Sequence, residues 1–270
     1  MNKPIYRHLA EKKWRSYDHK LIEQRISQHH IVPDLLPKLQ PTADVQLFFR
    51  RAKIPPGATV PSLVSEVPPR LRVQVFDSGP RLVSVVVVDA DVPNLEEDTF
   101  TKRCHFMAAN IPLDPTSNSL PFSKLPAEQL AVPWLPPFAH KGSPKHRLSI
   151  FLLEQSGPVD MAKLRELYKP GHDAVGFSLK SFRDKFALKP VGFNIFRTEH
   201  DESTAAVMAR HEIPGADLEF RRNRVYSAKT PRKPRGWEAK RQGPKYRHLW
   251  KYTKRIRGLS NAKRWTKKGN

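Results

Sequence analysis

The chain has 270 residues and a formal net charge of +22, with 48 Lys and Arg residues against 26 Asp and Glu residues. This length permits one or two domains with a real hydrophobic core, and so large a positive charge indicates a polyanionic partner. A single cysteine, Cys104, excludes an internal disulfide and favours a reducing compartment, and no apolar run approaches the roughly 18 residues of a membrane span.

The positive charge is concentrated at the two ends of the chain. Residues 221–270 hold 19 Lys and Arg residues and one acid, Glu238, whereas residues 31–220 hold 22 residues of each sign. We therefore predict three parts: an N-terminal helix and proline-rich arm over 1–42, a neutral globular domain over 43–220, and a basic RNA-binding extension over 221–270.

The first part begins with apolar residues at helical spacing over 8–28, which predicts one amphipathic helix. Pro33, Pro37 and Pro41 follow within nine residues, so no helix can continue there. We expect an extended arm that lies on the surface of the domain.

Strand signals begin at about residue 45. The candidate strands are 45–50, 71–76, 82–88, 105–111, 147–154 and 192–199, with Pro- and Gly-rich turns between most of them. Asp160 and Ser178 are suited to cap short helices over 161–168 and 179–187. Residues 201–220 give no clear pattern, and a helix there remains open. The sum of these signals predicts a mainly β protein, a β-sandwich or Greek-key core with a few short helices.

The strand over 82–88 is the most apolar of these. Its valines predict burial on both faces of a sheet. Asp89 and Asp91 follow at once, and we expect Pro93 to end the ladder pairing because proline lacks the backbone donor. Two acids at the rim of a core either order the turn or line a pocket.

Four motifs occur in the order and spacing of the phosphatidylethanolamine-binding-protein family, which the region 40–210 resembles. They are Asp89-Ala90-Asp91-Val92-Pro93, His105-Phe106 in a strand ending at Asn110, Gly142 leading to His146-Arg147-Leu148, and Phe182-Arg183 with Phe186 before the last strand. The resemblance implies a PEBP-like Greek-key sandwich. Ala90 replaces a family proline, and Leu148 replaces a tyrosine whose hydroxyl reaches the ligand in the family.

In that family the matching side chains meet in a small pocket for anionic head groups. The resemblance implies that Asp89, Asp91, His105 and His146 form a vestigial form of this pocket. Two readings stay open: imidazoles that still donate to a phosphate, or an inherited polar cluster that satisfies itself. Zinc would suit these residue types, but no compact ligand spacing is present, so we expect neither a metal nor another cofactor. No Ser or Cys occupies a recognisable nucleophile elbow, and we expect no catalysis.

The basic extension interleaves Lys and Arg with aromatic residues, which favours RNA over an anionic membrane surface because no amphipathic apolar face is present. A short basic helix is possible over 245–257. The residues predicted to bind RNA are Arg221, Arg222, Arg224, Arg232, Lys233, Arg235, Trp237, Arg241, Lys245, Tyr246, Arg247, Trp250, Lys254, Arg255 and Arg257.

A PEBP-like core with a proline-rich arm and a basic extension resembles the PEBP-like group of the mitochondrial large ribosomal subunit. The resemblance implies a structural constituent in the mitochondrial matrix that binds large-subunit rRNA and neighbouring ribosomal proteins in the central-protuberance region. No small-molecule ligand is expected. The alternative is a PEBP-like regulator that binds an anion or lipid head group and carries a basic, membrane-attracted tail.

Overall fold

The computed structural model describes residues 3–115, 118–168, 171, 175–221 and 235–238. Contacts within the chain divide it into Met1–Arg222 and Asn223–Asn270, and every helix and strand named below belongs to the first unit. The predicted basic helix over 245–257 lies outside the described residues.

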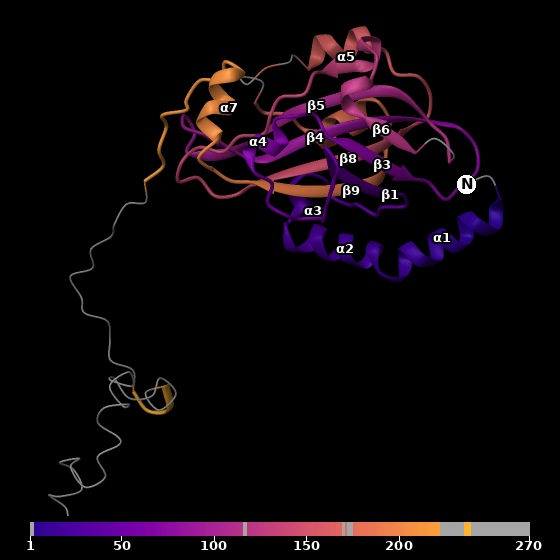
Figure 1. Ribbon diagram of the computed structural model, residues 1–270, viewed down its shortest axis with the longest axis horizontal. Coiled ribbons are helices and arrows are strands. Elements are labelled where there is room, and N and C mark those ends of the chain that lie inside the picture. Colours follow the sequence, from indigo (N-terminus) through magenta and orange to yellow (C-terminus); the bar gives the residue numbers. More distant parts are fainter. Residues whose placement is uncertain (1–2, 116–117, 169–170, 172–174, 222–234, 239–270) are drawn as a thin grey trace, which may run out of the picture. The chain divides into compact units, whose positions relative to one another are not determined.

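Two antiparallel sheets form the core of this unit (Figure 1). The four-stranded sheet has the order β2-β1-β3-β6, and the five-stranded sheet has the order β7-β5-β4-β8-β9. The mainly β sandwich that the sequence predicts is therefore confirmed. The strands are β1 (Asp44–Phe49), β2 (Ala52–Ile54), β3 (Arg70–Gln74), β4 (Arg81–Asn94), β5 (Thr99–Leu113), β6 (Ser119–Pro121), β7 (Leu130–Val132), β8 (His146–Gln155) and β9 (Lys189–Thr198).

Strand β4 is the middle strand of the larger sheet, between β5 and β8. Its side chains alternate between two cores: Val85 and Val87 pack toward the four-stranded sheet, whereas Val86 and Val88 pack on the opposite face. All four valines are fully buried. The prediction of a strand buried on both faces is confirmed, because a β-branched run can fill a layer on each side of a pleated strand.

The end of β4 differs from the prediction. Pro93 does not end the pairing: it lies opposite Phe100 in the ladder with β5, which continues to Asn94. The pairing with β8 stops at Asp89, so beyond that point β4 has a neighbour on one side only. A proline is tolerated at such an edge because its missing N–H is not required there.

The N-terminal segment forms helices that pack on the sheet. Helices α1 (Pro4–Ser16) and α2 (Asp18–Gln28) are separated at Tyr17, which has φ −136° and ψ −62°, so the prediction of one continuous helix is wrong. A third short helix, α3 (Ile31–Asp34), follows where we expected only an extended arm. Apolar side chains of α2, α3 and the residues after them enter the core beside β4 and β8, which explains why this segment is ordered.

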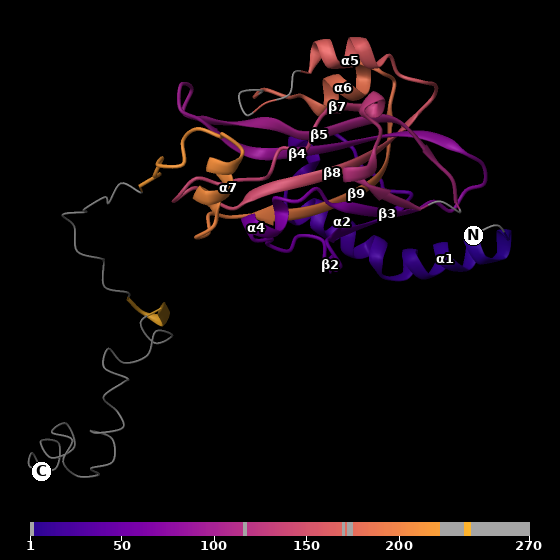
Figure 2. The same cartoon turned by 45° about the horizontal axis from the view of Figure 1, so that its top comes forward.

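The remaining helices lie around the sandwich (Figure 2). They are α4 (Ser62–Ser65), α5 (Met161–Leu167), α6 (Leu179–Lys185) and α7 (Thr204–Arg210). The Asp160 carboxylate accepts from two backbone N–H groups of α5, and the Ser178 hydroxyl accepts from one of α6, so both predicted caps are confirmed. Helix α7 forms in the stretch over 201–220 that the sequence left open. No described helix is long and apolar enough to cross a membrane.

Candidate functional site

Three of the four predicted pocket residues meet at the end of the central strand. Asp89 lies on β4, and the neighbouring strands β5 and β8 contribute His105 and His146. The Asp89 Oδ2 atom is 2.7 Å from His146 Nδ1 and 3.8 Å from His105 Nε2. At most 1% of each of these three residues is exposed to solvent.

The hydrogen bonds define the charge of this cluster. Burial opposes ionisation of Asp89, but the charge of His146, its 2.7 Å hydrogen bond and the nearby His105 ring outweigh it and lower the pKa of the carboxyl. Although burial also works against it, the Asp89 carboxylate raises the pKa of His146. Ser143 Oγ donates to the His140 carbonyl at 2.8 Å and accepts from His146 Nε2 at 3.4 Å, which suits a doubly protonated ring. Asp89 and His146 therefore form a buried ion pair.

His105 is held from its other side. Its Nδ1–H donates to the Leu135 carbonyl at 3.0 Å, so Nε2 is the atom that faces Asp89. That Nε2 atom has no hydrogen-bond partner among the described residues. The ring packs edge-on against Phe138, with centroids 6.3 Å apart, and the Arg103 guanidinium lies 4.9 Å from the centre of the Phe138 ring. The imidazole is fixed by protein atoms rather than left free to turn toward a ligand.

Asp91 does not join the cluster. Its carboxylate binds the Arg147 guanidinium through Nε at 2.8 Å and Nη2 at 2.7 Å. Arg147 Nη1 donates in turn to the His29 carbonyl at 2.5 Å and to Asp34 Oδ2 at 2.9 Å. The hydrogen bonds of Asp91 are the largest cause of a raised pKa at Arg147. Asp91 thus ties the N-terminal helices to the sandwich, a structural role that the sequence reading did not assign.

Residues 211–220 follow α7, and we call them the strap. They pack on the loop between β7 and β8, which contacts both His105 and His146. Phe220 N–H donates to the Lys141 carbonyl at 2.8 Å, and His140 Nδ1–H donates to the Gly215 carbonyl at 3.1 Å. Gly142 has φ +81°, and a Cβ there would lie 2.0 Å from the Phe220 carbonyl oxygen. The glycine is therefore required for this close approach.

The strap also has an apolar contribution. Ile213 joins Phe138 and Met208 in a small separate core. Phe138, which packs on His105, is therefore itself in contact with the strap. Leu148, directly opposite Asp89 in the ladder, is fully buried in the core. Leu148 has no hydroxyl to offer a ligand, and it lies among the apolar side chains of the core.

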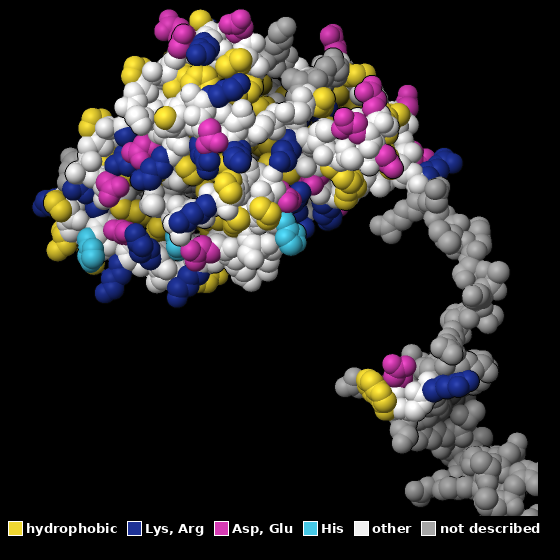
Figure 3. All heavy atoms as spheres, turned by 180° about the vertical axis from the view of Figure 1, so that it is seen from behind, with side chains coloured by type: hydrophobic (Ala, Val, Ile, Leu, Met, Phe, Trp, Pro, Cys, Tyr) yellow, Lys and Arg dark blue, Asp and Glu magenta, His cyan; other side chains and the backbone are white. Residues whose placement is uncertain are grey.

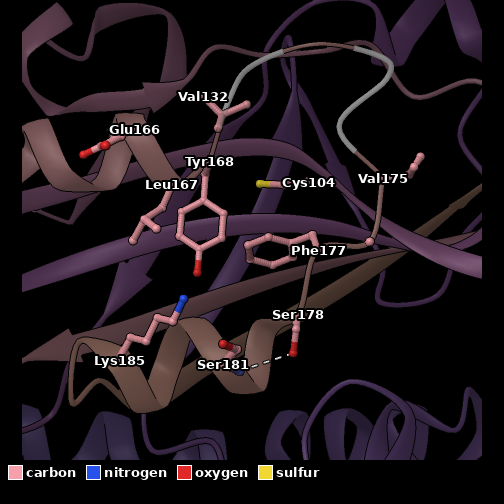
Figure 4. Close-up of a pocket in the computed structure, with 11 residues that line it drawn as sticks. Cys104, Val132, Glu166, Leu167, Tyr168, Val175, Phe177, Ser178, Ser181 and Lys185 are labelled. Carbon is pink, nitrogen blue, oxygen red and sulfur yellow. Dashed lines mark hydrogen bonds between the residues drawn. The ribbon is translucent and has the colours of Figure 1, made fainter.

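A different cavity, of about 390 Å³, lies beside α5 and α6 (Figure 4). The rings of Tyr168 and Phe177 lie in edge-to-face contact at its wall, with centroids 5.3 Å apart; Cys104 lies behind them and Lys185 on the α6 side. Burial raises the pKa of Cys104 to about 12, so the thiol stays protonated near neutral pH and is a poor nucleophile. The described residues contain no group of three or more His, Cys, Asp or Glu side chains that could hold a metal ion.

Most of the predicted RNA-binding residues lie outside the described part of the chain. Of that set the structure describes Arg221, Arg235 and Trp237; Arg221 pairs with Glu219 at 3.0 Å, and Trp237 is 65% exposed. On the first unit, Figure 3 shows basic and acidic side chains mixed over the face drawn there. The residues outside the description are Arg222, Arg224, Arg232, Lys233, Arg241, Lys245, Tyr246, Arg247, Trp250, Lys254, Arg255 and Arg257.

Comparisons with known proteins agree with the fold. The sequence model of the family described as phosphatidylethanolamine-binding protein matches residues 48–198. Over 214 residues the chain is 29% identical to the large ribosomal subunit protein mL38 of Schizosaccharomyces pombe; the match covers 77% of this chain and 66% of that protein, just under two thirds. A solved phosphatidylethanolamine-binding protein from Plasmodium vivax is 18% identical, with a TM-score of 0.50 over 66% of this chain and 97% of that one, and shows the shared fold.

Proposed function

The chain belongs to the phosphatidylethanolamine-binding protein family, and we propose that it serves as a structural, non-catalytic constituent of the mitochondrial large ribosomal subunit. The Schizosaccharomyces pombe relative is a protein of that subunit, and the similarity to it extends well beyond the matched family domain. The similarity supports an equivalent position for this chain in the mitochondrial matrix.

One observation from the structure carries the proposal. The polar cluster that the family uses for head groups is buried and closed here: Asp89 forms its ion pair with His146 inside the protein, and at most 1% of either residue is exposed. Asp91 is occupied by Arg147, and the strap packs over the enclosing loop. A domain whose ancestral pocket is closed in this way is better suited to serve as a packing unit than as a receptor for small anions.

We propose that RNA binding resides chiefly in residues 221–270. Their 19 basic residues can neutralise rRNA phosphates and release counterions, and their aromatic residues can stack on unpaired bases or pack on protein neighbours. In this proposal the folded unit contacts neighbouring large-subunit proteins in the central-protuberance region. No reaction step is assigned to any residue.

The experiment compares incorporation of the full chain with that of a chain ending at residue 220. We expect the full chain to enter the large subunit and to crosslink to rRNA through 221–270, and the shortened chain to enter poorly. Normal incorporation of the shortened chain, with no crosslink from 221–270 of the full chain, would contradict the proposed role of the extension.

A second function is favoured by one specific observation. His105 Nε2 has no hydrogen-bond partner among the described residues, and the cationic His146 beside it reaches only the Ser143 hydroxyl through Nε2, at 3.4 Å, so a small displacement of the loop would expose a charged donor to an anion. This reading makes the protein a head-group-binding regulator. Calorimetric titration of phosphorylethanolamine into the wild type, His146→Ala and the exposed control His8→Ala decides between them. Binding that only His146→Ala abolishes would favour the regulator, and no binding favours the structural role.

A further inference from the structure

A cavity of about 380 Å³ lies on the folded unit, between α1 and the outer face of the four-stranded sheet. We propose that it binds one nucleotide of an RNA strand. This inference rests on the proposed ribosomal function only for the source of the RNA, and it places an RNA contact outside the basic extension. The lining residues named in the argument are Lys13, Trp14, Asp18, Asp44, Gln46, Lys53 and Arg72.

Strand alternation places polar side chains on this face. In β1 the apolar Val45 and Leu47 point into the core, so Asp44 and Gln46 point outward. Gln46 lies opposite Arg72 in the ladder with β3. Lys53 comes from β2, the edge strand beside β1. The floor of the cavity is therefore a set of cations, amides and carboxylates fixed on three adjacent strands.

Trp14 forms part of the wall and supplies an aromatic ring. Its ring packs on Phe76 and His19, with centroid distances of 5.2 and 4.7 Å, and the residue is only 3% exposed. The buried indole Nε1–H has no hydrogen-bond partner among the described residues. Because this donor is buried, an acceptor of the ligand can reach it only if the Trp14 ring shifts, and the new hydrogen bond would then offset a cost of about 1–3 kcal/mol.

The cations of the cavity are available to a ligand. Lys13, Lys53 and Arg72 form no ion pair with any described residue. They can therefore contact a phosphate without first breaking an ion pair. Contacts between cations and phosphates give RNA binding its salt dependence.

The carboxylates determine which polyanion fits. Asp44 accepts from Gln46 at 2.7 Å, and burial raises its pKa, with the nearby charge of Asp18 as a further cause. Two acids beside three cations disfavour an acidic peptide, whose side-chain carboxylates are acceptors only and would be repelled by Asp18 and Asp44. A nucleotide offers acceptors on the phosphate and donors on the ribose 2′-OH and the base, and a volume of this size is in the usual range for a small-ligand site.

The test uses the full-length protein and a single-stranded 12-nucleotide RNA that contains 4-thiouridine. After irradiation, mass spectrometry of the wild type should locate crosslinked peptides from the neighbourhood of Trp14 and from β1–β3, in addition to those from 221–270. This measurement requires no variant and so does not depend on the folding of one.

The second measurement is the salt dependence of RNA affinity for two double variants of equal charge. Lys53→Gln with Arg72→Gln should reduce the slope of log K against log salt by about 1.4, at about 0.7 per lost contact to a single strand. The control, Lys163→Gln with Lys180→Gln, changes exposed cations on α5 and α6 and should leave the slope near that of the wild type. Trp14→Phe keeps an aromatic ring, removes the donor and should weaken binding severalfold.

The outcomes separate this inference from the proposed function. Crosslinks confined to 221–270, with equal slopes for the two double variants, would overturn the nucleotide site and leave the ribosomal role intact. A wild type that binds no RNA at all would overturn both. Stronger binding of a polyglutamate peptide than of RNA, lost with Lys53 and Arg72, would overturn the site in favour of an acidic protein partner.

Discussion

Replacing Asp89 with Asn should destabilise the folded unit, because the substitution leaves the His146 cation buried without its counter-charge. The Asp89 carboxylate is 1% exposed and lies 2.7 Å from His146 Nδ1. Removing one partner of a buried ion pair typically costs about 3–5 kcal/mol. Asn keeps the shape and one acceptor oxygen, so we expect a loss of about 3 kcal/mol in the free energy of unfolding.

The pH dependence gives this prediction its specificity. The pKa of His146 is raised from 6.5 on folding, so its contribution to stability is complete below pH 6.5 and is lost as pH rises through the folded-state pKa. The pKa of Asp89 is lowered from 3.8, so its contribution is present above pH 3.8 and is lost as pH falls toward the folded-state value. The ion pair should therefore stabilise the wild type most between pH 3.8 and pH 6.5.

The assay is urea unfolding of the full chain followed by tryptophan fluorescence, at intervals from pH 5 to pH 9. Above pH 6.5 the wild type should lose up to about 1.4 kcal/mol per pH unit from this one proton, and Asp89→Asn should lose less because its His146 is already less basic. Asp217→Asn, at an exposed position, is the control and should follow the wild type. A loss below 1 kcal/mol in Asp89→Asn, or an unchanged pH slope, would refute the buried ion pair.

Three further outcomes are expected. Arg147→Ala should lower the free energy of unfolding by about 2–3 kcal/mol and speed hydrogen exchange in α2, since Arg147 joins that end of the chain to Asp91; exchange as slow as in the wild type would contradict this link. Gly142→Ala should displace the strap, because its Cβ would lie 2.0 Å from the Phe220 oxygen, and limited proteolysis should then cleave within 211–220. Cys104, with a pKa of about 12, should react with a thiol reagent at pH 8 far more slowly in the native than in the unfolded protein, and comparable rates would show that the thiol is accessible.

Much of the fold could be predicted because its strongest signals are local. The valine run of β4 and the caps at Asp160 and Ser178 depend on nearby residues, and all three predictions are confirmed. Strands β2, β6 and β7 have three residues each, too few to show an alternating pattern, and they were not predicted. Their positions depend on neighbours that are distant in the sequence.

The errors share a physical cause, which is that tertiary neighbours decide what a local signal can do. Pro93 ends a strand only where both sides are paired, and β4 loses its β8 neighbour at Asp89. The apolar pattern over 8–28 is compatible with one helix or two, and packing of Trp14 against His19 and Phe76 accompanies the break at Tyr17.

The sequence predicted which residues meet at the candidate site better than it predicted their contacts. The order of the motifs predicted that Asp89, His105 and His146 meet, and in the structure they do. The partner of Asp91 had a signal, since Arg147 directly follows His146 in the motif, but only the structure shows which acid it binds. The strap gave no periodic signal, and its bond from His140 to Gly215 spans 75 residues. How the loop beside His105 and His146 is covered therefore depends on a contact that the sequence pattern does not reveal.

The most direct test of the central claim is sedimentation of the native full-length protein from mitochondrial lysate through a density gradient at low and at high salt. The account predicts that the protein migrates with the large ribosomal subunit at low salt and leaves it only when the salt concentration is high enough to weaken contacts with RNA phosphates. It also predicts that His146→Ala, if folded, migrates in the same fractions. A protein that remains at the top of the gradient at low salt would contradict a ribosomal role.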